Sequence, residues 1–313
     1  MGVVNNKLTY ISPEIGKLSR LSMLYLSKNQ LVNLPAEMEN LTKLTHLDLS
    51  HNQLKTLSVN MANFTELVDV NLSENQLESL PAELENATKI THLKLGQNQL
   101  REITFDIGKL TNLGFLYLED NQLIQLPAQI GGLSQLIRFV LPNNNLQSLP
   151  AEIGGLTELR ILRLSGNKLL SLPKEIGLLR LLDSLIVSNN QLKDLPAEME
   201  DMASLTELYL NGNPLQTLPP VITRITDLGS LNLDNTQLRE LPAEIGKLTN
   251  LSTLYLSNNQ LTDLPPEIEN LQALEVLSLY GNPMSDETIA KIQSWLPNCE
   301  IILQWGEEGT ETI

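Results

Sequence analysis

The stretch from Leu251 to Leu271 reads LSTLYLSNNQLTDLPPEIENL, and it decides the fold because nearly the same pattern returns every 23 residues. The fixed point of the pattern is an asparagine, here Asn259. Steps of 23 residues from Asn29 to Asn282 meet asparagine at every position except Thr236. The steps define twelve units without insertions or deletions, and Asn6 marks a thirteenth, truncated unit at the front. A fixed period of this length indicates a solenoid of stacked units.

Seven apolar positions in each unit predict its core. In the quoted unit they are Leu251, Leu254, Leu256, Leu261, Leu264, Ile268 and Leu271. Seven buried aliphatic side chains contribute roughly 14 kcal/mol, which is less than the ordering entropy of a unit at about 1.5 kcal/mol per residue. We therefore expect that one unit cannot fold alone, and that the strands of successive units pair in parallel.

The spacing of the apolar residues changes within each unit. Around residues 254–256 it has a period of two, which predicts a short strand, and over residues 264–271 it has the period of a helical turn. In nine units a proline follows the leucine five residues after the asparagine, as Pro265 does here, and we assign it to the first turn of the helix. Two units carry Leu57-Ser58 and Ile103-Thr104 instead, so their turns should differ slightly.

The asparagine column also has a predicted role. A buried amide can both donate to and accept from backbone groups that a curved turn leaves without partners. Thr236 can satisfy fewer of these groups.

The consensus LxxLxLxxNxLxxLPxEIxxLxx resembles that of leucine-rich repeat proteins. In its 23-residue length and its Leu-Pro-x-Glu-Ile segment, the chain is similar to the plant intracellular Ras-group repeat proteins, the Scribble and Erbin group, and bacterial Roco-type and stand-alone repeat proteins. The resemblance implies an α/β solenoid, a horseshoe or arc with a parallel sheet on its concave side and short helices on its convex side. It also implies a recognition module or scaffold, and no reaction.

We divide the chain into a truncated N-terminal repeat (1–22), twelve repeats (21–283), a helix-strand cap (284–303) and an acidic tail (304–313). Ser285 should cap the helix, whose apolar stripe is Ile289, Ile292 and Leu296, and a strand is expected at Ile301–Leu303. The front of the chain offers no polar cover for the first core. Self-association through this end and origin from a longer protein are both open.

The formal net charge is −16 and the sequence pI is near 4.6, so nucleic acid and anionic membranes are poor partners. Cys299 is the only cysteine, which excludes an internal disulfide and favours a cytoplasmic, bacterial protein. A secreted bacterial effector is the alternative.

Partner binding is expected at the strand positions six and four residues before each asparagine, whose side chains point away from the core. Between residues 115 and 209 these positions are aromatic, aliphatic and arginine, which is typical of binding hot spots. The partner-binding residues that we predict are Phe115, Tyr117, Arg138, Val140, Ile161, Arg163, Ile186, Glu207 and Tyr209. The alternative is that such residues simply suit a strand.

His46, Asp69 and His92 share one column on three adjacent strands, the only arrangement that resembles a metal site. The two histidines should lie nearly 10 Å apart, at two strand spacings. We therefore expect exposed His and Asp side chains with no metal, and no cofactor elsewhere.

The sequence contains no GxxxxGK[ST], HExxH or GxSxG motif, and the repeats leave little room for a catalytic domain. We expect Cys299 to be a buried cap residue. The main hypothesis is a scaffold or adaptor, not an enzyme, that binds a protein on its concave face. The rival is the sensing region of a multidomain signalling enzyme, such as a Roco-like GTPase or a ubiquitin ligase.

Overall fold

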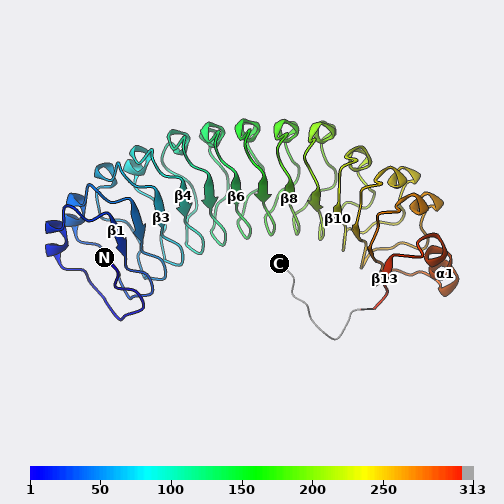
Figure 1. The fold of residues 1–313 in the computed structure, drawn as a ribbon, viewed down its shortest axis with the longest axis horizontal. Coiled ribbons are helices and arrows are strands. Elements are labelled where there is room, and N and C mark those ends of the chain that lie inside the picture. Colours follow the sequence, from blue (N-terminus) through cyan, green and yellow to red (C-terminus); the bar gives the residue numbers. More distant parts are fainter. Residues whose placement is uncertain (305–313) are drawn as a thin grey trace. The chain divides into compact units, whose positions relative to one another are not determined.

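A computed structural model describes residues 1–304 of the chain. The chain forms two compact units, Met1–Lys168 and Leu169–Ile313. Within each unit, three-residue strands alternate with short helical segments, and Figure 1 shows the strands in one row and the helical segments in another. The predicted acidic tail, 304–313, lies outside the described residues except for Gln304.

In the first unit, seven parallel strands follow one another in chain order. They are β1 (Met23–Tyr25), β2 (His46–Asp48), β3 (Asp69–Asn71), β4 (His92–Lys94), β5 (Phe115–Tyr117), β6 (Arg138–Val140) and β7 (Ile161–Arg163). The 3-10 segments of this unit are η1 (Pro13–Lys17), η2 (Ala36–Asn40), η3 (Met61–Asn63), η4 (Ala82–Asn86), η5 (Ile107–Lys109), η6 (Ala128–Gly132) and η7 (Ala151–Gly155).

The second unit repeats the arrangement, and its described part ends in a different helix and strand. Its parallel strands are β8 (Ser184–Ile186), β9 (Glu207–Tyr209), β10 (Ser230–Asn232), β11 (Thr253–Tyr255), β12 (Val276–Ser278) and β13 (Glu300–Ile302). Its helical segments are η8 (Lys174–Leu178), η9 (Ala197–Asp201), η10 (Pro220–Arg224), η11 (Ala243–Lys247), η12 (Pro266–Asn270) and the α-helix α1 (Asp286–Trp295).

The register of the strands follows the 23-residue period. Phe115 on β5 pairs with Arg138 on β6, and Arg138 pairs with Ile161 on β7. The middle residue of each strand points inward, so that Leu116, Phe139 and Leu162 have no exposed surface. The core therefore lies between the strands and the 3-10 segments of each unit, as the apolar positions predict.

The short helices are 3-10 segments, and the predicted place of the proline is wrong by one residue. Pro265 has an extended backbone with ψ of 145° and is the N-cap residue of η12, so the first helical residue is Pro266. The Pro265 carbonyl accepts from the Ile268 amide, three residues later, at 3.0 Å. Five residues are too few for α-helical hydrogen bonds to build up, and the tighter turn uses them better.

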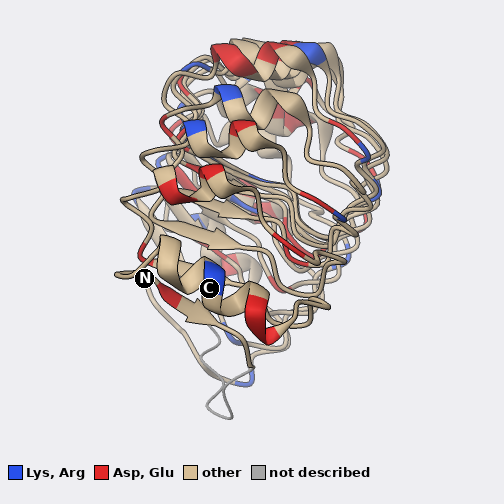
Figure 2. Cartoon of the chain, turned by 90° about the vertical axis from the view of Figure 1, so that its right-hand side faces the viewer, with Lys and Arg blue, Asp and Glu red and all other residues tan. Residues whose placement is uncertain are grey.

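Acidic residues lie in the first turn of many of these segments, as Glu267 and Glu269 do in η12. Asp and Glu recur along the row of helical segments in Figure 2. Negative charge near the amino end of a helical turn complements its dipole. Part of the net charge of −16 is therefore explained by the local chemistry of the helical turns.

The two units that lack the proline have shorter turns, as predicted. Among the described 3-10 segments only η3 and η5 are three residues long. In both, a hydroxyl occupies the proline position and donates to a carbonyl in the preceding repeat. Ser58 Oγ lies 2.9 Å from the Leu34 oxygen, and Thr104 Oγ1 lies 3.1 Å from the Leu80 oxygen.

The asparagine column has the predicted bonding role. Asn75 is buried, and its amide nitrogen donates to the carbonyls of Leu72 in its own repeat and Leu49 in the preceding repeat, at 3.1 and 3.0 Å. Its oxygen accepts from the Leu54 amide of the preceding repeat at 3.1 Å. Each asparagine therefore joins two repeats.

Thr236 breaks this pattern. Its hydroxyl donates to the Leu233 carbonyl, in the same repeat, at 2.6 Å and to Asn259 Oδ1 at 3.1 Å. In the preceding repeat, the Leu215 amide takes the Asn213 carbonyl instead, at 2.9 Å.

Thr236→Asn should raise the free energy of unfolding by about 1 kcal/mol, because the amide restores an acceptor for the Leu215 N–H. Urea denaturation followed by circular dichroism measures the change. The matched control, Asn213→Thr, copies the exception into the preceding repeat and should lower stability. A fall in the melting temperature of Thr236→Asn would contradict the bonding role of the column.

The C-terminal helix begins as predicted. The Ser285 hydroxyl accepts from the Thr288 amide at 3.1 Å and caps α1, and Ile292 and Leu296 are buried. The strand lies one residue earlier than predicted, because β12 and β13 pair from Val276 and Glu300 onward, so Leu303 falls outside it.

Candidate functional site

The predicted partner-binding residues divide between the two units. The β5–β7 face is defined by Phe115, Tyr117, Arg138, Val140, Ile161 and Arg163, all in the first unit. Ile186, Glu207 and Tyr209 lie on β8 and β9 of the second unit. In both places the predicted residues are the outer members of their strands, because the residue between each pair is buried.

The register arranges the β5–β7 face in two rows. Arg138 lies between Phe115 and Ile161 in the first row. Val140 lies between Tyr117 and Arg163 in the second. Val140 is only 8% exposed, so it offers a partner less surface than predicted, whereas the other five are half-buried. Large neighbours on both sides cover its small side chain.

Phe115 is held by an aromatic neighbour. Its ring stacks on that of His92 on β4, with centroids 4.4 Å apart and an angle of 11° between the rings. Stacked rings have few rotamers to lose when a partner binds. Phe115 is therefore a preorganised apolar contact at one edge of the face.

Unsatisfied polar atoms gather on this side of the first unit. Across residues 1–304, the buried side-chain atoms that lack a hydrogen-bond partner are Glu119 Oε2, Arg138 Nε and Arg163 Nε. Neither arginine forms an ion pair with any described acid. Burial of an unpaired polar group costs free energy, so these arginines are suited to a ligand that supplies acceptors.

Glu119 was not among the residues predicted from the sequence. It follows β5 at the position two residues before an asparagine, where six other repeats carry serine. Its carboxylate lies over Gly96, towards β4, and burial raises its pKa. The departure from serine at this position was the available signal.

A groove of about 490 Å³ lies beside Phe115. It is lined by Lys89, Thr91, Asn112, Gly114, Phe115, Gln135 and Ile137. Gly114 occupies a position where the adjacent repeats carry Thr91 and Ile137, so the missing side chain leaves space. A Cβ atom built at Gly114 would lie 3.7 Å from its nearest neighbour, the Thr91 oxygen. The backbone would therefore tolerate a side chain there.

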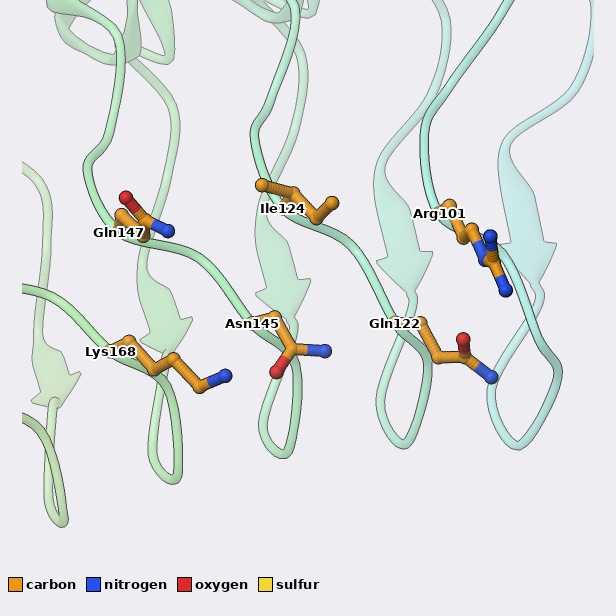
Figure 3. Close-up of a pocket in the computed structure, with 6 residues that line it drawn as sticks. All are labelled: Arg101, Gln122, Ile124, Asn145, Gln147 and Lys168. Atoms are coloured by element: carbon orange, nitrogen blue, oxygen red, sulfur yellow. The ribbon is translucent and has the colours of Figure 1, made fainter.

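A second hollow, of about 310 Å³, lies on the flank of the first unit. Figure 3 shows Arg101, Ile124 and Gln147 in one row and Gln122, Asn145 and Lys168 in another. Ile124 is 53% exposed. This surface was not predicted, because its residues lie outside the strands to which partner binding was assigned. The two cations lie at opposite ends of it, as Figure 3 shows, with neutral side chains between them.

In the second unit, the exposed Glu207 and the half-buried Tyr209 lie on β9, where Tyr209 Oη accepts from Ser230 Oγ at 3.4 Å. Asp234, which was not predicted as a site residue, follows β10. Burial raises its pKa to about 6, although the Ser257 amide donates to its carboxylate at 2.5 Å. Burial also raises the pKa of Tyr255 on β11. This side of the second unit is therefore polar and partly desolvated.

The predicted histidine column is in place, since His46, Asp69 and His92 pair in register on β2, β3 and β4. Each histidine ring, however, lies against the threonine before it: Nδ1 is 2.9 Å from Thr45 Oγ1 in one case and from Thr91 Oγ1 in the other. Within the described residues, no three His, Cys, Asp or Glu side chains are grouped to hold a metal ion.

Cys299 is half-buried between α1 and β13, and burial raises its pKa to about 11. Its thiol is therefore protonated at neutral pH, which is unfavourable for a nucleophile. No described helix is long and apolar enough to cross a membrane.

Comparisons with known proteins point to one family. A family model for the leucine rich repeat matches residues 1–54 and 157–215, and a model for two copies of the repeat matches residues 249–291. The search of curated proteins gave no match.

Solved structures share the fold over nearly the whole chain. A leucine-rich repeat protein of Leptospira interrogans is 30% identical, with a TM-score of 0.67, over 96% of this chain and 94% of that one. An internalin of Listeria monocytogenes is 25% identical, with a TM-score of 0.80, over 98% and 86%. The repeat ectodomain of a receptor kinase of Arabidopsis thaliana is 30% identical, with a TM-score of 0.72, over 98% of this chain and 42% of that one. With its repeated strands, its asparagine column and these matches, the chain belongs to the leucine-rich repeat family.

Proposed function

We propose that this protein binds a protein partner on the outer face of its parallel strands, and that the β5–β7 face makes the main contact. The observation that carries the proposal is the pair of arginines, Arg138 and Arg163, which have buried, unpartnered Nε atoms beside Phe115. Arginine and aromatic residues dominate binding hot spots. Strand propensity alone explains apolar residues on a sheet, but it does not explain arginines left without partners.

The comparisons support a binding role. The Arabidopsis receptor ectodomain was solved in complex with CASPARIAN STRIP INTEGRITY FACTOR 2. The protonated Cys299 also favours a scaffold or adaptor over an enzyme. We further propose a cytoplasmic location, because a single cysteine cannot form the disulfides that stabilise many extracellular proteins.

The test combines Phe115→Ala with Arg163→Ala. The double variant should fold normally and lose the partner that the wild-type protein captures from cell extract. The dissociation constant for the purified partner, measured by calorimetry, should rise about 100-fold or more, because truncating each of two hot spots costs about 2 kcal/mol.

The matched control is Ile124→Ala with Arg101→Ala, which removes one apolar residue and one arginine from the flank of the same unit. It should leave affinity unchanged. Equal binding by wild type and the Phe115/Arg163 variant excludes the β5–β7 face. Ile186, Glu207 and Tyr209 are proposed as additional contacts of the second unit, and Ile186→Ala with Tyr209→Ala tests them separately.

A further inference from the structure

We propose that the segment bound at the β5–β7 face is an extended acidic peptide of the partner, held by Arg138 and Arg163 through its carboxylates. An apolar side chain next to the acidic residues would fill the groove at Gly114. The inference rests on the proposed function and names the chemistry of the partner.

The two arginines lack the acidic partners that other cations of the first unit have. Lys89 lies 2.7 Å from Glu66, and Lys109 lies 2.7 Å from Glu85. Arg138 and Arg163 are more buried than these lysines, which are about half exposed, yet no described acid pairs with them. A guanidinium presents five donors in a planar fork that matches a carboxylate. An acidic ligand would supply the missing acceptors.

The nearest acid on the same face does not fill this role. Glu119 extends from the end of β5 over Gly96, on the β4 side, which is away from Arg138 on β6. The other outer side chains of β5 and β7, Phe115, Tyr117 and Ile161, carry no charge. The local charge of the β5–β7 face is therefore positive, in a chain whose net charge is −16.

The spacing of the two arginines matches that of an extended peptide. Arg138 pairs with Ile161, and Val140 pairs with Arg163, so the two arginines are diagonal neighbours on β6 and β7. Diagonal neighbours in a sheet lie about 7–8 Å apart. Residues i and i+2 of an extended peptide point to the same side and lie about 7 Å apart. Two acidic side chains with this spacing can each reach one arginine.

The groove of about 490 Å³ adds an apolar contact, since Phe115 and Ile137 line it from adjacent repeats. Phe115 also neighbours Arg138 in the register, so groove and arginine adjoin. Pockets that take a ligand side chain are mainly apolar with a few polar groups at their edge. The combination selects a carboxylate beside a large apolar side chain.

The probe is a library of random 12-residue peptides displayed on phage and selected on the whole protein. The consensus peptide is then synthesised, and its affinity is measured by fluorescence anisotropy at low and at physiological salt. We expect selected peptides to carry Asp or Glu close to a Leu, Met or Phe, and to bind more tightly at low salt.

Three variants test the site. Arg138→Gln and Arg163→Gln remove the charge at similar size, and Gly114→Leu fills the groove. Each should weaken binding about tenfold or more. The matched controls are Arg101→Gln on the flank and Gly229→Leu, which lies at the same repeat position in the second unit and has the same 3.7 Å clearance to a threonine oxygen. Both should bind within about twofold of wild type.

The outcomes separate the inference from the proposed function. Selected peptides that lack acidic residues but lose affinity with Phe115→Ala overturn the acidic partner and keep the binding face. Acidic peptides whose affinity is unchanged in both arginine variants overturn the arginine site. A selection that enriches no peptide, or only peptides insensitive to all substitutions on the β5–β7 face, counts against both.

Discussion

Asn121→Ala is expected to lower the free energy of unfolding by about 4 kcal/mol, a large effect for the loss of one polar side chain. Asn121 Oδ1 accepts from the Leu100 amide at 3.0 Å. Its Nδ2 donates to the carbonyls of Leu95 and Leu118 at 3.0 and 3.1 Å. Alanine leaves one N–H and two carbonyls buried without partners, and each costs about 1–3 kcal/mol.

Urea denaturation of the whole protein, followed by circular dichroism, measures this loss. The control is Asn112→Ala, because Asn112 is exposed and donates to the Thr88 carbonyl alone, at 2.8 Å. The control should change stability by less than about 1 kcal/mol. Since each buried asparagine joins two repeats, Asn121→Ala should also broaden the transition, as local unfolding separates from the rest. Equal losses for the two variants would show that the column contributes no more than a surface amide.

The second large effect concerns pH. Burial raises the pKa of Asp234 to about 6, so the folded protein binds a proton there that the unfolded chain releases at lower pH. A raised carboxyl pKa destabilises the folded state above pH 6, and the penalty disappears as the pH falls towards the ordinary value of about 4. Asp234→Asn should therefore stabilise the protein by about 2 kcal/mol at pH 8 and have little effect at pH 4.

The asparagine can keep the hydrogen bond, because its Oδ1 can still accept from the Ser257 amide. The measurement is the difference in unfolding free energy between variant and wild type, taken at several values between pH 4 and pH 8. Asp201→Asn, at an exposed position of η9, serves as the control and should show a small, flat difference. A difference for Asp234→Asn that does not change with pH would contradict the raised pKa.

Much of the fold is determined by the sequence through its period. Side chains alternate across a strand, so the apolar residues at 116, 139 and 162 had to face inward and their neighbours outward. The same logic predicts the register, since units of equal length stack with equal positions side by side. The family, the parallel strands and the outward positions of the predicted binding residues are confirmed, while their binding role stays a prediction.

Local details followed less closely from the pattern. Pro265 suits both the first helical residue and the residue before it, and the structure takes the latter because the carbonyl of Pro265 closes the 3-10 turn. The last strand begins at Glu300, where pairing with β12 starts, because backbone hydrogen bonds set its limits rather than hydrophobicity. Such boundaries depend on one or two hydrogen bonds, which composition does not specify.

The chemistry of the candidate site was decided by the tertiary structure. The sequence places arginines at 138 and 163, but whether an acid reaches them depends on the rotamers of side chains from other repeats. The groove beside Phe115 exists because Gly114 stands between the larger Thr91 and Ile137, each 23 residues away. The desolvation of Glu119 and Asp234 likewise comes from neighbours contributed by adjacent repeats. A repeating sequence determines which positions meet, whereas burial and pairing arise only when the particular side chains at those positions pack together.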